Sequence, residues 1–314
     1  MQLYSAWFQI VNFLIKRQYN LTMKKEVVAV LGGSGFIGKH VVNKLDEIGF
    51  LVRILDKEVN DIHKEKHTIF ESDILDKDTL SECIKGCKYV YNFAGIADIK
   101  EASVNPIKTI EKNILGSALA IEESLNAKVK KYLYASTMYV YSDRGGFYRS
   151  TKQASEDIIC SYNEKYGIEY VMLRYGTIYG PGAQKWNSMR KYIEQILETG
   201  KVDYIGNGEE IREYIHVNDA AQLSIEALSE SYRNCRLNIT GSQVLKSIDM
   251  LHMIGEILGK KVEINFIKND PYNNHYISTP YRYTSKRAKK VVPKDFIDIG
   301  HGILEIIQDI DLNK

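Results

Sequence analysis

The sequence predicts an α/β protein in which a doubly wound parallel sheet is followed by a smaller C-terminal α/β lobe. Short apolar runs of strand length alternate with stretches of helical periodicity from residue 26 to about residue 175. The first run, Val27-Val28-Ala29-Val30-Leu31, is apolar throughout, which is typical of a strand buried on both faces. Regular alternation of strands and helices indicates βαβ units and therefore a parallel sheet. The alternation ends at Gly180-Pro181-Gly182.

The expected elements follow one another in this order. Strands are expected at 26–31, 50–55, 68–71, 89–93, 131–135 and 169–174. Helices are expected at 36–48, 77–85, 107–125 and 150–166. The chain then divides into a sheet domain and a smaller lobe, the first formed by residues 23–183 plus about 217–240 and the second by residues 184–216 plus about 241–314.

The composition is that of an ordinary globular protein. Of 314 residues, 44% are hydrophobic and 26% are charged, which is enough for a sizeable core. A formal net charge of +2 gives no long-range attraction to nucleic acid or to acidic membranes, so neither is expected as a partner. No apolar run reaches the roughly 20 residues of a membrane span. The four cysteines lack zinc-ligand spacing, so no metal is expected. We expect these thiols to be reduced, which favours a location in the cytoplasm.

Residues 1–22 differ from the rest of the chain. The segment from Ala6 to Ile15 is apolar, but no basic segment precedes it and no small-residue cleavage site follows it. Met23 stands directly before the first strand, and we expect it to be the natural start. The preceding stretch is then an upstream extension or a docking helix, and the sequence leaves both open.

A glycine-rich turn follows the first strand. Gly32, Gly35 and Gly38 lie between that strand and the helix that contains Phe36 and Ile37. Such a turn lets the backbone approach a pyrophosphate closely, and the helix N-terminus adds amide donors and a partial positive charge. Glycines also form ordinary tight turns, but a turn placed at the start of a βαβ unit favours a dinucleotide site.

The second strand ends in an acidic residue, Asp56. A carboxylate at this place accepts hydrogen bonds from the adenosine ribose hydroxyls and repels a 2′-phosphate. It therefore favours NAD over NADP. The alternative is a simple turn residue at the end of a strand.

A tyrosine and a lysine four residues apart form the candidate catalytic pair. Tyr148 and Lys152 share one face of the expected helix, and Ser136 and Thr137 stand at the end of the preceding strand. A phenol has an ordinary pKa near 10, and a neighbouring ammonium together with an oxidised nicotinamide stabilises its anion. With 22 tyrosines in the chain, a chance match is the alternative. The glycine turn and the strand-end hydroxyls, in this order, argue for catalysis.

These residues carry a family resemblance that extends from about residue 26 to the end of the chain. Thr137, Tyr148 and Lys152 resemble the Ser/Thr–Tyr–Lys triad of the extended short-chain dehydrogenases/reductases. The segments Arg174 to Gly182 and Gly206 to Asp219 resemble two further motifs of the same proteins. The chain is identified as a member of the NAD-dependent epimerase/dehydratase family, which implies a Rossmann-type fold.

The resemblance implies further site residues and a partner. Around the cofactor, NAD, it implies contacts from Asp73, Ile74, Phe93, Ala94, Gly95 and Asn113, besides Tyr148 and Lys152. The implied substrate is a nucleotide-diphosphate-sugar, and the residues implied to bind it are Thr137, Tyr148, Thr177, Arg212 and Arg282. Arg212 is the candidate for the diphosphate, unless it pairs with a neighbouring glutamate. A homodimer is also expected.

The residues after the catalytic threonine narrow the reaction. Family dehydratases carry Asp-Glu there, whereas this chain has Met138 and Tyr139, neither of which does carboxylate chemistry at neutral pH. Dehydration is therefore not expected. Decarboxylation is not expected either, because family decarboxylases carry Glu at the position of Tyr139. We expect a 4-epimerase that oxidises the sugar transiently at C4. The alternatives are an NAD(P)H-dependent nucleotide-ketosugar reductase and a non-catalytic dinucleotide-binding protein.

Overall fold

The computed structural model describes residues 26–59, 66–267, 275, 277–279 and 289–312. Its main feature is a sheet of eight strands that all run parallel, in the order β13-β10-β6-β5-β4-β1-β2-β3. The strands are β1 (Val27–Leu31), β2 (Leu51–Asp56), β3 (Thr68–Glu71), β4 (Tyr89–Asn92), β5 (Lys131–Thr137), β6 (Glu169–Tyr175), β10 (Cys235–Ile239) and β13 (Lys289–Val291). This order confirms the predicted doubly wound, Rossmann-type sheet.

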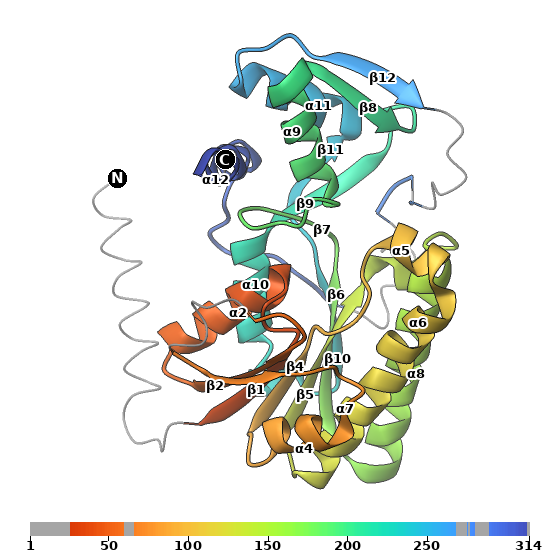
Figure 1. Cartoon of the computed structure of the whole chain (residues 1–314), viewed down its shortest axis with the longest axis vertical. Helices are drawn as coiled ribbons and strands as arrows, with labels where there is room; N and C mark the ends of the chain where they lie inside the picture. Colours follow the sequence, from red (N-terminus) through yellow and green to blue (C-terminus); the bar gives the residue numbers. More distant parts are fainter. Residues whose placement is uncertain (1–25, 60–65, 268–274, 276, 280–288, 313–314) are drawn as a thin grey trace.

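Helices cover both faces of the sheet (Figure 1). On one face lie α2 (Phe36–Glu47) and α10 (Val217–Glu226), packed on Val28 and Val30. On the other face Ala29 and Leu31 pack with α4 (Lys77–Ile84), α7 (Gly116–Asn126) and α8 (Gly146–Tyr166). Successive side chains of a strand point to opposite faces, so one apolar strand supplies both cores. The continuous apolar run of β1 is explained by this arrangement.

The predicted helix at 107–125 is a composite. It consists of α6 (Pro106–Ile110), a π-helical turn at Glu111–Leu115 and α7, and it is preceded by the short α5 (Ile99–Val104). The π-turn contains Asn113, whose carbonyl accepts a hydrogen bond from Ser155 Oγ at 2.8 Å. A π-turn displaces the helical hydrogen-bond register, and such turns recur at functional sites.

A smaller lobe stands above the carboxyl ends of the sheet strands (Figure 1). Its core joins α9, α11 and α12 through residues such as Ile193, Ile254 and Ile303. The helices are α9 (Ser188–Thr199), α11 (Ser247–Ile257) and α12 (Ile299–Leu312). The strands form two small sheets, in the orders β11-β9-β7 and β12-β8, from β7 (Thr177–Tyr179), β8 (Lys201–Ile205), β9 (Ile211–His216), β11 (Gln243–Lys246) and β12 (Glu263–Ile267).

Two short strands differ from the predicted division. β7 pairs with β9 in the smaller lobe, although residues 177–179 fall within the range predicted for the sheet domain. β13 pairs with β10 at the edge of the large sheet, so residues 289–291 belong to the sheet domain and not to the smaller lobe. Three residues of strand are too short to give a periodic signal in the sequence. Residues 1–22, Met23 and Arg282 lie outside the described residues.

Candidate active site

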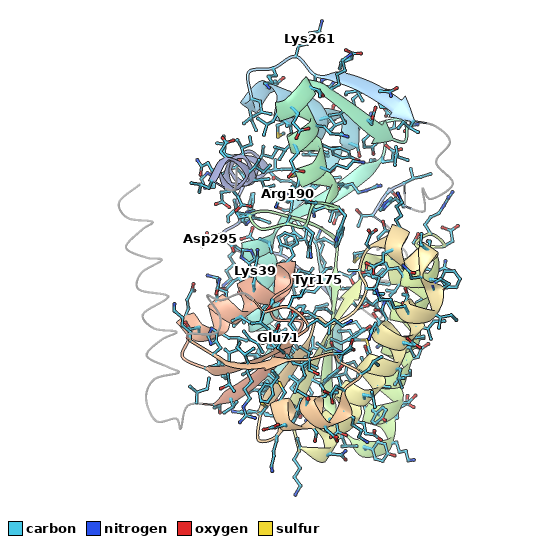
Figure 2. All side chains as sticks on the ribbon, viewed as in Figure 1. Lys39, Glu71, Tyr175, Arg190, Lys261 and Asp295 are labelled. Carbon is cyan, nitrogen blue, oxygen red and sulfur yellow. The ribbon has the colours of Figure 1, made fainter. Side chains whose placement is uncertain are left out.

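A cleft of about 610 Å³ opens where the large sheet meets the smaller lobe. It lies at the carboxyl ends of β1 and β4, between which the chain order of the sheet reverses, and this is where open α/β sheets bind ligands. Figure 2 places Tyr175, which lines the cleft, at the boundary between the two parts. The predicted residues along its wall are Gly32, Gly35, Phe36, Ile37, Gly38, Asp56, Ile74, Phe93, Ala94, Gly95, Thr137, Tyr148, Lys152, Thr177 and Arg212.

The glycine turn is packed so closely that side chains are excluded. A Cβ on Gly32, whose φ is +77°, would lie 2.7 Å from the amide nitrogen of Ala94, and one on Gly38 would lie 2.1 Å from the carbonyl oxygen of Gly32. The N-terminus of α2 has no side-chain cap and no acidic residue in its first turn. The hydroxyl of Ser34 is buried without a hydrogen-bond partner in the described chain. Uncapped amides and an unsatisfied hydroxyl suit a pyrophosphate.

Asp56, the last residue of β2, is hydrogen-bonded to this turn. One of its carboxylate oxygens accepts from the Ser34 amide at 2.9 Å, and the other accepts from the Lys57 amide at 2.8 Å. Burial raises the pKa of the Asp56 carboxyl, and these amide hydrogen bonds oppose the shift. The carboxylate is therefore held rigidly at the cleft wall, where ribose hydroxyls would meet it.

Two residues predicted to contact the cofactor are not among the described lining residues. The Asp73 carboxylate binds Lys57 at 2.7 Å and Lys112 at 2.5 Å. Burial acts to raise the pKa of Asp73, but the two lysines outweigh it and lower the value to about 2. Asn113 is fully buried behind the loop that follows β4. Its side-chain oxygen accepts from the Ile96 amide at 2.7 Å, and its nitrogen donates to the Ile96 carbonyl at 3.0 Å.

The candidate catalytic pair lies in the first two turns of α8. This helix begins at Gly146, four residues before the start that the sequence predicts. Lys152 is buried, and its ammonium donates to the Ala135 carbonyl at 2.8 Å and stands 4.8 Å from the ring centroid of Tyr134. Burial lowers the pKa of Lys152, while the charges of Tyr148 and Glu156 oppose the shift. Tyr148 and Thr137 line the same part of the cleft. The structure thus brings the three predicted residues together.

A buried ion pair, Glu156 with Arg174, lies next to the Tyr148–Lys152 pair. Glu156, one helical turn after Lys152, pairs with Arg174 of β6 and accepts from Ser136 Oγ at 2.5 Å. Both charged side chains are almost fully buried. Ser136 is thus committed to Glu156, whereas the Thr137 hydroxyl accepts only a 3.3 Å hydrogen bond from the Tyr139 amide among the contacts described and also lines the cleft.

The smaller lobe contributes Arg212 and Thr177 to the wall of the cleft. Arg212 donates to the Ile211 and Ile277 carbonyls, each at 3.1 Å, and its side chain lines the cleft. Of the three neighbouring glutamates, Glu209 pairs with Lys246, Glu210 accepts from Tyr204 and Glu213 pairs with Lys290. Thr177 lies at the start of β7 on the same wall.

Several lining residues were missed from the sequence. Tyr139 and His275 are hydrogen-bonded to each other at the cleft wall, and Trp186, about half exposed, stands on the wall contributed by the smaller lobe. Gln184, Asn187 and Ser188 lie beside Trp186 in sequence and also line the cleft. For the residues around Trp186, one signal in the sequence was available, namely the short irregular stretch between Gly182 and α9. Loops of this kind commonly carry ligand-binding residues.

Two further findings concern metals and membranes. In the described residues, no group of three or more His, Cys, Asp and Glu side chains is arranged to hold a metal ion. None of the helices that the structure describes combines the length and apolar character needed to cross a bilayer.

The chain is similar to known proteins over most of its length. A putative UDP-glucose 4-epimerase of Methanocaldococcus jannaschii is 28% identical over 90% of this chain and 97% of its own. A UDP-glucuronate 4-epimerase of Thermodesulfobacterium geofontis is 25% identical over 91% and 97%. A Thermotoga maritima UDP-glucose 4-epimerase, solved with UDP-glucose, superposes with a TM-score of 0.80 at 23% identity, over 92% of this chain and all of the other. The last likeness supports the fold.

The family model confirms the resemblance. The model of the NAD-dependent epimerase/dehydratase family matches residues 28–239, which include the glycine turn, Asp56 and the Thr137–Tyr148–Lys152 group. NAD, the cofactor expected from Asp56, is the cofactor on which this family depends. The chain, with its glycine turn, its Tyr-Lys pair and its parallel sheet, belongs to the NAD-dependent epimerase/dehydratase family.

Proposed function

We propose that the protein is an NAD-dependent 4-epimerase acting on the sugar of a nucleotide-sugar. The observation that carries the proposal is the grouping of Thr137, Tyr148 and buried Lys152 in one cleft. The turn that follows Thr137, Met138–Tyr141, contains no carboxylate. The triad supports oxidation and reduction of a hydroxyl. Since Met138 and Tyr139 stand where a dehydratase carries acids, elimination at the neighbouring carbon is not supported.

Each residue of the group has one task in this proposal. Tyr148 moves the proton of the C4 hydroxyl, and Thr137 holds that hydroxyl by a hydrogen bond. Lys152 stabilises the phenolate of Tyr148 by its charge and holds the nicotinamide ribose. Bound NAD supplies the acceptor and donor of hydride. The turn formed by Gly32, Gly35 and Gly38 would hold its pyrophosphate.

The two parts of the molecule divide the binding work in this proposal. The sheet domain holds the dinucleotide, and the smaller lobe holds the nucleotide-sugar with Arg212 at its diphosphate. An arginine fork matches phosphate oxygens, and a charged hydrogen bond contributes roughly 1.5–3 kcal/mol. The related UDP-glucose and UDP-glucuronate 4-epimerases support this substrate class.

Analysis of the cofactor released from purified protein tests the proposal against the reductase alternative. An epimerase regenerates its cofactor in every cycle, so we expect NAD to remain bound through gel filtration and to be released by denaturation. Turnover of a nucleotide-hexose to its C4 epimer should require no added cofactor. A protein that consumes NAD(P)H stoichiometrically with a nucleotide-ketosugar would instead be a reductase.

A further inference from the structure

Two lysines of the cleft share one carboxylate oxygen. Lys57 Nζ lies 2.7 Å and Lys112 Nζ lies 2.5 Å from the same atom, Oδ2 of Asp73. Both lysines line the cleft, whereas Asp73 is not among the lining residues that the structure describes. The two ammonium groups therefore stand side by side, held by a carboxylate that is not itself part of the wall.

The fold places this cluster next to Asp56. Lys57 follows Asp56 directly in the chain. In the neighbouring strand Glu71 pairs with Asp56, and the Ser72 amide donates to the Asp56 carbonyl at 2.9 Å, so Asp73 is the next residue along. The hydrogen bond to Asp73 raises the pKa of Lys57, and the charge of Asp56 acts in the same direction. The cluster therefore lies beside the carboxylate that would meet the 2′-hydroxyl of the adenosine ribose.

Three elements hold the cluster in place. Lys112 stands in the π-turn Glu111–Leu115, and its side chain is only 14% exposed. Asp73 lies between β3 and α4, where its Oδ1 atom accepts from the Leu75 amide at 3.0 Å. Lys57 follows β2 and is about half exposed, and its bond to Asp73 fixes the direction of its side chain. Residues from separate parts of the chain thus converge on the Asp73 carboxylate.

The charges of the cluster bear on the choice between NAD and NADP. NADP carries an additional phosphate on the adenosine 2′-oxygen, and basic side chains near that oxygen accommodate it. Asp56 repels such a phosphate, but two unpaired lysines beside Asp56 would attract it. Because Asp73 binds both ammonium groups, it opposes this attraction.

We propose that Asp73 is a specificity-determining residue that maintains the preference for NAD by binding Lys57 and Lys112. Asp56 acts on the cofactor directly in this proposal, whereas Asp73 acts through the two lysines. This role differs from a contact with adenine, which would serve NAD and NADP alike. The proposal concerns the choice of cofactor, and it does not depend on which sugar reaction the protein catalyses.

Calorimetric titration of cofactor-free protein with NAD and with NADP tests the proposal without turnover. Asp73→Asn removes the charge and keeps an oxygen for the Leu75 amide. Its dissociation constant for NADP should fall about tenfold, while that for NAD stays within about twofold of the wild type. The gain should shrink at high salt, because Lys57 is about half exposed. Adding Lys57→Gln to Asp73→Asn should return the NADP affinity toward the wild-type value.

Glu230→Gln is the matched control. Glu230 pairs at 2.6 Å with Lys130, just before the start of β5 and thus away from the carboxyl ends of the strands. This variant changes the net charge equally and should leave both dissociation constants unchanged. If Asp73→Asn does not fold, Asp73→Ser carries the same test, because its hydroxyl can still accept from the Leu75 amide. Equal weakening of both cofactors, an unchanged ratio of the two dissociation constants, or a wild type that prefers NADP would each overturn the proposal.

Discussion

Replacing Asn113 by alanine should destabilise the protein and weaken NAD binding without touching the cofactor. The side chain satisfies both the amide and the carbonyl of Ile96, which is 7% exposed, in the loop that lines the cleft. Leaving a buried polar group unsatisfied costs about 1–3 kcal/mol, so the two groups together predict a loss on the order of 4 kcal/mol. The third partner, Thr151, keeps its bond to the Tyr148 carbonyl at 3.0 Å.

Urea unfolding of the cofactor-free protein measures the loss, and titration with NAD measures the change in affinity. The control is Asn126→Ala at the exposed end of α7, whose amide bonds Glu123 at 3.4 Å, and its effect should stay within about 0.5 kcal/mol. If Asn113→Ala lies within 1 kcal/mol of the wild type and binds NAD equally well, the loop is not held by this side chain.

Three more predictions concern the triad, the diphosphate and a buried carboxyl. Tyr148→Phe should lower kcat by about 10²–10⁴-fold with NAD affinity unchanged in titrations, whereas Tyr166→Phe, exposed on the same helix, should be neutral. Arg212→Ala should raise the Michaelis constant for the nucleotide-sugar about 10–100-fold, with equal calorimetric affinity for nucleotide diphosphate counting against it. Burial raises the pKa of Asp219 to about 6, so its contribution to stability is lost as pH rises from about 4 to 6. Between pH 4 and pH 6, the free energy of unfolding of Asp219→Asn should therefore rise by about 2–3 kcal/mol relative to that of the wild type, as measured by urea unfolding. A difference in free energy that stays the same across this pH range would refute the raised pKa of Asp219.

The sequence predicted most of what local pattern controls. The apolar run of β1, the glycine turn and the Tyr148–Lys152 spacing are each set within a few residues, so their structure and position in the cleft were predictable. The π-turn around Asn113 was not predictable, because the residue that its side chain binds, Ile96, lies 17 positions away in the chain. Periodicity alone predicts one continuous helix there.

The contact between Tyr139 and His275 could not be predicted from the sequence for the same reason. Tyr139 was read as a residue without carboxylate chemistry, and nothing near it in the chain indicates His275 as its partner. Pairing across 136 residues depends on how the smaller lobe folds back on the sheet. Trp186 likewise stands in an irregular stretch with no periodic signal.

The fate of hydrogen on C4 tests the epimerase proposal most directly. A nucleotide-sugar carrying deuterium at C4 is turned over by the purified protein without added cofactor, and the product is analysed by mass spectrometry and proton NMR. The proposal predicts that the C4 epimer keeps its deuterium at C4, because NAD that stays bound would return the same hydride to the carbon from which it came. Loss of the label to solvent or to free cofactor, or an unchanged sugar, would contradict it.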